Sequence, residues 1–223
     1  MGFACGIVGL PNVGKSTLFN AITSAGIAAE NYPFCTIEPN TGVVPVPDLR
    51  LKWLSDSFHT QREVPTTIEF VDIAGLVRGA AKGEGLGNQF LGHIRSVDAI
   101  AHVVRCFDDD NVIHVEVTVD PLRDIETVET ELILKDLETV QKRIDAAARK
   151  AKLNDKEAKE EIEVGQRLLD HLSAGFLAIS FERNEREREL TSEYHMLTDK
   201  PVMYIANTDE DGLINGNELI ERV

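Results

Sequence analysis

The apolar positions of the chain first follow the spacing of an α/β protein. Phe3 to Val8 is a short apolar run that predicts a strand, and Thr17 to Thr23 behind it predicts a helix. Thr66 to Val71, ending at Asp72, predicts a second strand, and Ala99 to Phe107 predicts a buried parallel strand. Strands that alternate with helical segments predict a mostly parallel sheet.

Further elements complete this expected sheet. Thr41 to Val46 predicts a strand whose proline suits a sheet edge, and Pro201 to Asn207 predicts another buried strand. Leu91 to Val97 predicts a short helix. The run Gly75 to Gly92 before and into it is rich in glycine, which indicates a loop that changes shape.

From about Pro121 to Leu197 the apolar spacing becomes helical. Two stripes flank a charged break at Asn154-Asp155, the first of Ile133, Leu137, Val140 and Ile144, the second of Ile162, Leu168, Leu169 and Leu172. They predict an antiparallel helical hairpin of the coiled-coil type. We therefore divide the chain into a nucleotide-binding domain that begins with residues 1–120, a helical insertion of residues 121–197, and the resumed nucleotide-binding domain, residues 198–223.

Composition narrows the classes of partner. A net charge of −15 argues against broad wrapping around nucleic acid, and we expect no sequence-specific DNA binding. A local basic patch remains in the predicted hairpin, although a solvated helix face is the more common explanation; it comprises Lys142, Arg143, Arg149, Lys150 and Lys152.

No apolar stretch approaches the roughly 20 residues that span a bilayer, and no secretory signal precedes the first strand. We expect a cytoplasmic protein with no membrane contact. The three cysteines, Cys5, Cys35 and Cys106, have no metal-site spacing and are expected to be buried thiols.

The segment Gly9 to Ser16 carries the clearest chemistry. Its sequence GLPNVGKS matches the phosphate-loop pattern, and it lies between a predicted strand and a predicted helix. Gly9 and Gly14 let backbone N–H groups point into one concavity, where phosphate oxygens meet the positive end of the helix. Lys15 provides a charge for the β and γ phosphates, and Ser16 provides a hydroxyl ligand for Mg²⁺.

Two further positions predict a nucleotide-dependent switch. Asp72 to Gly75 matches the D-x-x-G pattern, in which the aspartate holds Mg²⁺ and the glycine N–H meets the γ-phosphate. Thr36 is the candidate threonine that closes over the metal in the triphosphate state. The position after Gly75, where many switch GTPases carry glutamine, is Leu76. Leucine cannot orient water, so we expect slow hydrolysis unless another group substitutes.

Three histidines near these segments are candidates for that group: His93, His102 and His114. We select His114, in the acidic loop after the Ala99 to Phe107 strand, as the catalytic candidate together with Lys15. A surface role is the more common one for a histidine at a loop end.

The base-reading segment favours adenine. Guanine-specific members of this class end the corresponding strand with Asn-Lys-x-Asp, whereas here it ends with Asn207-Thr-Asp-Glu210. The lysine is absent and the carboxylate is one methylene longer. A shifted register, Thr208 to Asp211, restores an aspartate and supports guanine instead. The segment also suits an Asx turn, with or without a ligand.

Together these residues resemble the Obg-like ATPases of the YchF type, a branch of the translation-factor-related P-loop switch proteins. The resemblance covers essentially the whole chain and includes 31–40 and 83–90 beside the motifs above. It implies a Ras-like fold, ATP preference, Mg²⁺ held by Ser16 and Thr36, the coiled-coil insertion, His114 as a catalytic candidate, and association with the ribosome or its large subunit. Members of this family continue into a C-terminal TGS domain, so we interpret the chain as an N-terminal portion.

We therefore expect a slowly hydrolysing, Mg²⁺-dependent ATP switch. The predicted nucleotide contacts are Asn12, Val13, Gly14, Lys15, Ser16, Thr17, Gly75, Asn207, Thr208 and Glu210; the predicted metal ligands are Ser16, Thr36 and Asp72. The alternatives are an Obg-type GTPase and a nucleotide-stabilised scaffold that docks on the ribosome or another protein. Transfer to a small acceptor, as in a kinase, is a distant third, because no second substrate constellation is visible.

Overall fold

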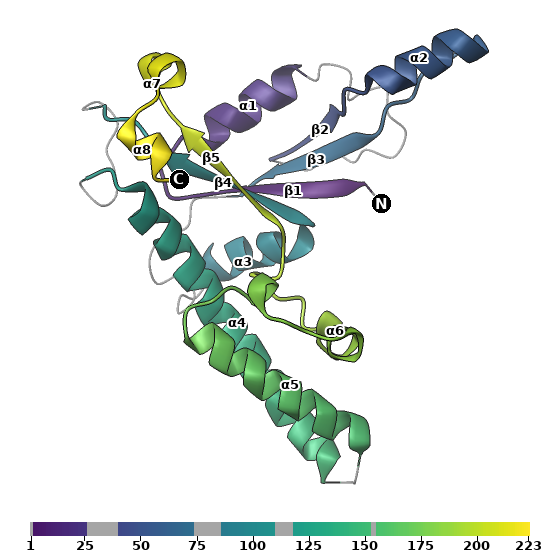
Figure 1. Cartoon of the computed structure of the whole chain (residues 1–223), viewed down its shortest axis with the longest axis vertical. Coiled ribbons are helices and arrows are strands. Elements are labelled where there is room, and N and C mark those ends of the chain that lie inside the picture. The colour runs from purple at the N-terminus through teal and green to yellow at the C-terminus, as the bar shows by residue number, and fades with distance from the viewer. Residues whose placement is uncertain (1, 26–39, 74–85, 110–117, 153–154) are drawn as a thin grey trace.

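The computed structural model describes residues 2–25, 40–73, 86–109, 118–152 and 155–223 (Figure 1). The first half contains β1 (Phe3–Val8), α1 (Lys15–Ala25), β2 (Thr41–Pro45), α2 (Leu49–Phe58), β3 (Thr67–Asp72), α3 (Leu86–Ser96) and β4 (Ala99–Arg105). The second half contains α4 (Pro121–Ala151), α5 (Lys156–Ser173), the 3₁₀ turn η3 (Ala178–Ser180), α6 (Glu185–Ser192), β5 (Val202–Asn207), α7 (Glu210–Asn215) and α8 (Glu218–Glu221).

The described strands form one five-stranded sheet in the order β2-β3-β1-β4-β5. β3, β1, β4 and β5 are parallel, and β2 pairs antiparallel with β3 at one edge. The predicted α/β fold with a mostly parallel sheet is confirmed. Pro45, which has no N–H to donate, ends the edge strand, where a missing ladder bond costs least.

Helices cover both faces of the sheet. α1 packs on one face, against β1 and β3, while α3 and the first half of α4 lie on the other (Figure 1). The central strands β1 and β4 are the most deeply buried, as predicted for β4. The main core combines these strands with α3 and α4 side chains, among them Ile7, Val8, Ile94, Val103, Val128 and Leu132.

The sequence predicts a buried strand at Pro201 to Asn207, and the structure confirms the strand but not its burial. β5 exists, but Met203 is 57% exposed and Tyr204 is 37% exposed. Among the described strands β5 pairs only with β4, so it forms the second edge of the sheet. An edge strand has a neighbour on one side only, which explains the exposure despite its apolar sequence.

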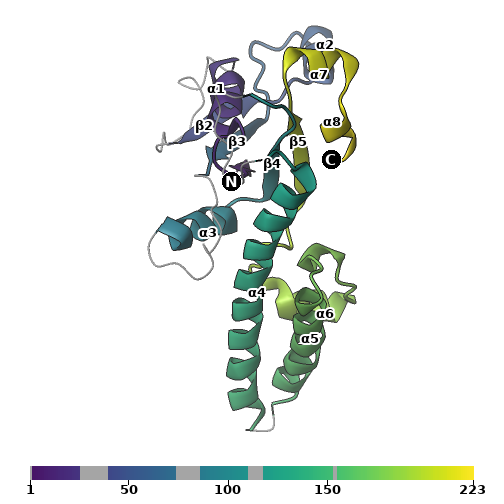
Figure 2. The same ribbon diagram turned by 90° about the vertical axis from the view of Figure 1, so that its left-hand side faces the viewer.

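α4 and α5 form the predicted helical hairpin, which extends away from the sheet (Figure 2). Asp120 and Asp155 cap the two helices by accepting the backbone N–H groups of Arg123 and Ala158. Apolar side chains of both predicted stripes meet in a second core with residues that follow α5, including Ile133, Val140, Ile144, Leu168, Leu172 and Tyr194. Whether the pair supercoils, and the division into domains, stay predictions.

Several boundaries differ from the sequence prediction. α1 begins at Lys15 and α3 begins at Leu86, earlier than predicted. The helices α2, α6, α7 and α8 were not predicted. α2 buries none of its residues and α6 buries only Thr191, so apolar periodicity, which reports burial, carries little signal there. Within the described part of the chain, no helix is both long and apolar enough to cross a membrane.

Candidate nucleotide-binding site

The predicted site residues gather at one edge of the sheet because parallel strands end on the same side. Val8 of β1, Asp72 of β3, Arg105 of β4 and Asn207 of β5 are all strand termini at this edge. α1 begins immediately after the loop that follows β1. In open α/β sheets this edge is where ligands bind.

The loop Gly9 to Gly14 needs unusual backbone geometry. Gly9 has φ +153° and Gly14 has φ +98°, and Asn12 also adopts a positive φ of 62°. A Cβ on Gly9 would lie 2.4 Å from the carbonyl oxygen of Val103, and a Cβ on Gly14 would lie 2.3 Å from Nδ2 of Asn207. Both glycines are therefore required by close approach as well as by backbone conformation.

Lys15, the first residue of α1, lies inside the loop. Its side chain is only 7% exposed, and Nζ donates a hydrogen bond to the carbonyl of Leu10 at 2.7 Å. Burial lowers the pKa of Lys15 to about 8, while the negative charge of Asp72 acts in the opposite direction. The ammonium group is thus held against the loop, where the negative charge of a phosphate would stabilise its protonated form.

Ser16 and Asp72, two of the predicted metal ligands, lie next to each other. The Ser16 hydroxyl donates to Oδ2 of Asp72 at 2.7 Å, which joins the start of α1 to the end of β3. Hydroxyl and carboxylate oxygens are ligands that suit Mg²⁺, which keeps several waters and binds through one or two protein groups plus phosphates. The pair therefore fits the metal. Among the described residues no cluster of three or more His, Cys, Asp or Glu side chains forms a separate metal centre.

Asn207 connects the end of β5 to the phosphate loop. Its Nδ2 donates to the carbonyl of Val13 at 2.8 Å, across 194 positions of sequence. The Val13 side chain is 1% exposed and belongs to the core, so this residue faces a ligand only through its backbone. Asn207 therefore positions the loop in addition to any contact with a base.

A cleft of about 450 Å³ opens beside the loop. This volume lies within the range of small-molecule sites. It is lined by Asn12, Gly14, Thr17, Phe107, Asp109, Asn207, Thr208 and Asp209. The predicted residues Asn12, Thr17, Asn207 and Thr208 are thus brought together, although their contacts with a nucleotide stay predictions.

The far wall of the cleft includes Asp209, and the predicted contact of Glu210 with a base stays a prediction. Asp209 lines it, whereas Glu210 is exposed as the first residue of α7 and lies outside the lining of the cleft in the described structure. The Asp209 side chain accepts the Gly212 N–H at 2.8 Å and caps α7. The bond reaches the third residue on, as in a helix N-cap, whereas an Asx turn bonds the second residue on.

Sequence reasoning missed the contribution of the end of β4. The fully buried side chain of Arg105 donates through Nε to the carbonyl of Phe107 at 3.0 Å and through Nη2 to that of Asp109 at 3.3 Å. Its guanidinium also lies 4.6 Å from the centre of the Phe107 ring. Arg105 thereby shapes the wall formed by Phe107 and Asp109. The available signal was position, because these residues follow a strand that ends at the ligand edge.

Four predicted positions lie outside the described residues: Thr36, Gly75, Leu76 and His114. Of the other histidines, His93 is exposed on α3. His102 is buried within β4, where burial, and secondarily the charge of Lys15, lowers its pKa to about 4. His102 is therefore neutral at pH 7, with its ring beside Tyr204.

The sheet order, the cradle between β1 and α1 and the aspartate at the end of β3 define a P-loop nucleoside triphosphatase domain of the GTPase class. Within that class, residues 4–150 match the family model of the 50S ribosome-binding GTPases. The chain belongs to this family.

Curated relatives confirm the resemblance to the YchF type. The chain is 56% identical over 223 residues to the ribosome-binding ATPase YchF of Haemophilus influenzae and 53% identical over 225 residues to that of Bacillus subtilis. All of this chain is covered in both cases, but only 61% and 62% of those proteins. A solved structure titled the Schizosaccharomyces pombe YchF GTPase has a TM-score of 0.84 and 41% identity, covering 99% of this chain and 61% of that one.

Proposed function

We propose that this chain is the nucleotide-binding portion of a ribosome-associated switch that binds ATP with Mg²⁺ and hydrolyses it slowly. The observation that carries the proposal is the convergence of Lys15, Ser16 and Asp72 beside the cleft. Ser16 and Asp72 would hold Mg²⁺, which neutralises phosphate charge when bound. Thr36 and Gly75 would complete the contacts to the γ-phosphate side.

Adenine preference rests on the base-reading segment. No lysine stands between Asn207 and Asp209 to lie along a guanine ring, and the bacterial relatives are named as ATPases. Ribosome association rests on the names of these relatives and of the matching family. Slow turnover is inferred from Leu76 at the usual glutamine position, and His114 is proposed as the substitute group.

The second candidate is a GTPase, and one observation favours it. Asp209, a carboxylate of the length found in guanine-specific sites, lines the cleft where Glu210 does not. Against it, the Asp209 carboxylate already accepts the Gly212 N–H. The S. pombe relative is itself titled a GTPase, so base selectivity is the property that separates the two proposals.

Calorimetric titration of the chain with ATP and GTP, each with Mg²⁺ and again with EDTA, tests this choice. We expect ATP to bind more tightly than GTP, and EDTA to weaken binding. The double variant T208K/E210D should move the preference toward GTP, while the matched control Glu218→Asp, on α8, should leave it unchanged. Tighter binding of GTP by the unaltered chain would overturn the adenine proposal.

Phosphate release, measured with and without ribosomes, tests the switch proposal itself. We expect a slow basal rate of ATP hydrolysis, and we expect ribosomes to change that rate. If the affinity for ribosomes changes neither with the nucleotide state nor with Lys15→Ala, the chain acts as a scaffold and the switch proposal fails.

A further inference from the structure

α2 is a helix that exposes its apolar side chains. It buries none of its ten residues, and the segment 46–65 that contains it leaves five large apolar side chains in water. Their exposed fractions are 89% for Leu49, 67% for Trp53, 45% for Leu54, 74% for Phe58 and 56% for Val64. We call these five side chains the α2 patch.

The α2 patch does little to hold α2 in place within this chain. Isolated helices shorter than roughly 12 to 15 residues are marginal in water, so α2 depends on its caps and its packing. Asp48 caps its N-terminus by accepting the Arg50 N–H at 2.9 Å, and Leu51 and Ser55 are its half-buried residues. The exposed side chains instead offer apolar surface that a partner could remove from water.

α2 lies at the end of the sheet opposite the nucleotide site. It connects the end of β2 at Pro45 to the start of β3 at Thr67, whereas Asp72 of the nucleotide site is at the other end of β3. Figure 1 shows α2 beyond the ends of β2 and β3, away from α4 and α5. A partner on the α2 patch would therefore leave the cleft open.

The size of the α2 patch suits a protein interface. Since an aromatic side chain buries about 150–250 Å², the five side chains together expose roughly 600 Å². This is the upper end of the range for the largest apolar patch on a typical monomer, about 300–600 Å². With the polar side chains around them, two such faces reach the roughly 1,200 Å² that a small specific interface buries.

The order of apolar residues along α2 favours a second copy of the chain as the partner. The helix begins at Leu49 and ends at Phe58, so its midpoint falls between Trp53 and Leu54. In an antiparallel pair of α2 helices about a two-fold axis, Leu49 of one copy would lie beside Phe58 of the other. Trp53 would likewise lie beside Leu54 of the second copy. Each exposed apolar residue of α2 thus meets another, as an isologous interface requires.

The charges on α2 fit the same antiparallel arrangement. Lys52 precedes the midpoint of the helix and Asp56 follows it. In the antiparallel pair, Lys52 of each copy would lie near Asp56 of the other. A parallel pair would instead bring like charges together, which is unfavourable.

Net charge favours this face over the other exposed apolar face. Two copies of a chain with a net charge of −15 repel each other. The segment 46–65 contains three Lys and Arg and three Asp and Glu, so its net charge is zero. Residues 202–223, which form β5, α7 and α8, also expose apolar side chains. They contain one Arg and five Asp and Glu, a net charge of −4.

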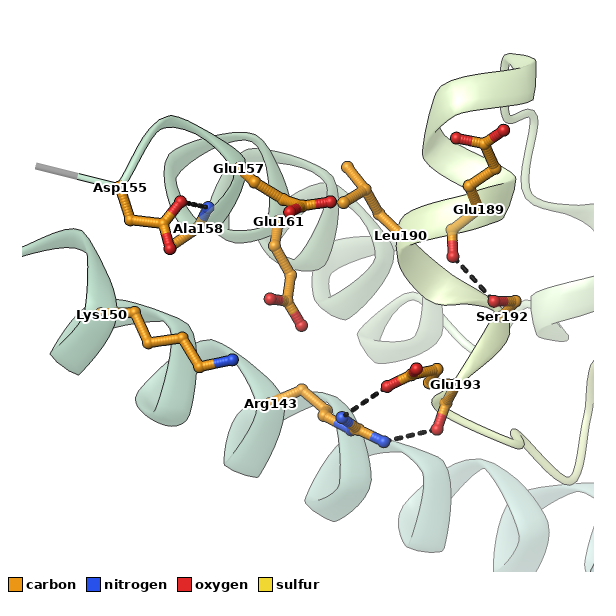
Figure 3. Close-up of a pocket in the computed structure, with 10 residues that line it drawn as sticks. All are labelled: Arg143, Lys150, Asp155, Glu157, Ala158, Glu161, Glu189, Leu190, Ser192 and Glu193. Carbon is orange, nitrogen blue, oxygen red and sulfur yellow. Dashed lines mark hydrogen bonds and ion pairs between the residues drawn. The ribbon is translucent and has the colours of Figure 1, made fainter.

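The groove between α4, α5 and α6 is acidic as well. Its volume is about 280 Å³. Figure 3 shows Arg143 bonded to Glu193 within it. Its charged lining residues are Arg143, Lys150, Asp155, Glu157, Glu161, Glu189 and Glu193. Two cations and five carboxylates leave a net charge of −3, so a second acidic copy would be repelled there.

We propose that two copies of this chain associate through the α2 patch, with their α2 helices antiparallel about a two-fold axis. Each copy keeps its nucleotide cleft open, because the cleft lies at the opposite end of the sheet. The proposal does not depend on which nucleotide the cleft binds.

Trp53 is the only tryptophan of the chain, so its fluorescence reports on the α2 patch directly. Sedimentation velocity of the full chain at increasing concentration measures its mass, and emission spectra of the same samples measure the exposure of Trp53. We expect a monomer–dimer equilibrium with a midpoint of about 1–100 μM, because the interface is at the small end of the range. As the dimer forms, the emission of Trp53 should shift to shorter wavelength and acrylamide should quench it less.

The variant L49Q/F58Q removes the apolar contact at both ends of the helix pair and keeps Trp53 as the reporter. It should dimerise at least about tenfold more weakly than the unaltered chain. The matched control L213Q/I214Q removes two exposed apolar side chains from α7, on the acidic face, and should dimerise as the unaltered chain does. Circular dichroism and ATP binding check that both variants fold.

Two charge variants test the antiparallel orientation. K52E and D56K each place like charges across the contact, and each should dimerise about threefold or more weakly. When the two variants are mixed, they should form a heterodimer more tightly than either forms a homodimer, because both contacts between the copies then join opposite charges. An effect confined to one helix cannot produce this recovery.

Three results would overturn the proposal. A chain that stays monomeric with Trp53 exposed would assign the α2 patch to a different protein. A shielded Trp53 in a monomer would show that the chain covers its own patch. Equal weakening of the dimer by L49Q/F58Q and by L213Q/I214Q would place the contact elsewhere.

Discussion

Lys15 illustrates how one buried residue ties the fold to its ligand. Its ammonium group is almost fully covered and bonded to the Leu10 carbonyl, and burial brings its pKa close to neutral pH. With this pKa the group is mostly protonated at pH 7, and the negative charge of a phosphate would stabilise the charged form further. Burying an ammonium group costs free energy, and this group is buried at the position where a phosphate would need a positive charge.

This environment predicts a pH dependence of nucleotide affinity. With a pKa of about 8 in the free protein, Lys15 loses its proton as the pH rises, and binding must then restore it. We expect ATP affinity to be about tenfold weaker at pH 9 than at pH 7. Titration across this range, with calorimetry in two buffers to detect proton uptake, checks it. Lys15→Met should bind weakly with no such pH dependence; an equal dependence would assign the effect to another group.

Asn207 makes a contact that a sequence motif cannot predict. The sequence placed it at the end of a strand as a base contact, and the structure adds that it holds the Val13 carbonyl. Its partner is 194 positions away, so no local pattern indicates the bond. Arg105 is similar, because a buried arginine in an apolar strand has no recognisable motif.

At the scale of elements, Asp136 connects the hairpin to the chain that returns to the sheet. Its carboxylate, on α4 and fully buried, accepts the backbone N–H groups of Leu197 and Thr198 and the Thr198 hydroxyl. These bonds fix the segment that leads into β5. Burial raises the pKa of Asp136, which the three donors oppose.

We expect Asp136→Asn to lower the free energy of unfolding by about 2 to 4 kcal/mol, because an amide cannot accept all three bonds and leaves buried donors unpaired. Glu138→Gln, two residues further on α4, removes only an exposed pair with Lys135 and should cost about 0.5 kcal/mol or less. Denaturant unfolding measures both. Equal stability of the two variants would contradict the role given to Asp136.

Helices and strands could be predicted from the sequence where burial of one face gives their apolar residues a regular spacing. The strands β1, β3 and β4 and the helices α4 and α5 have apolar faces that pack against the core, and all were anticipated. α2 exposes Trp53 and Phe58, so its sequence does not reveal a core-facing stripe. The exposure of β5 depends on its place in the sheet, which its apolar sequence does not report.

On the scale of the whole molecule, α4 belongs to two cores. Val128 and Leu132 pack with the sheet, whereas Ile133, Val140 and Ile144 pack with α5. A single helix with contacts in both clusters should couple their unfolding.

We therefore expect one thermal transition, and protection of α5 amides that rises with ATP as it does in the sheet. At 100 times its dissociation constant, ATP should add about 2.7 kcal/mol to both. Hydrogen exchange with and without ATP measures this. α2, which buries no residue, is the internal control and should not respond. Unchanged α5 protection would show that the hairpin opens independently.

Sequence alone determined the phosphate loop, the parallel sheet and the hairpin, because each follows from local rules of spacing, glycine geometry and burial period. Only the tertiary structure decided which distant residues contact the phosphate loop and the site around it. The Ser16–Asp72 pair, the Asn207–Val13 bond and the wall shaped by Arg105 join segments that are distant in sequence or lack any periodic signal. The same holds for the reach of the hairpin, because only the structure shows that α4 extends it away from the sheet.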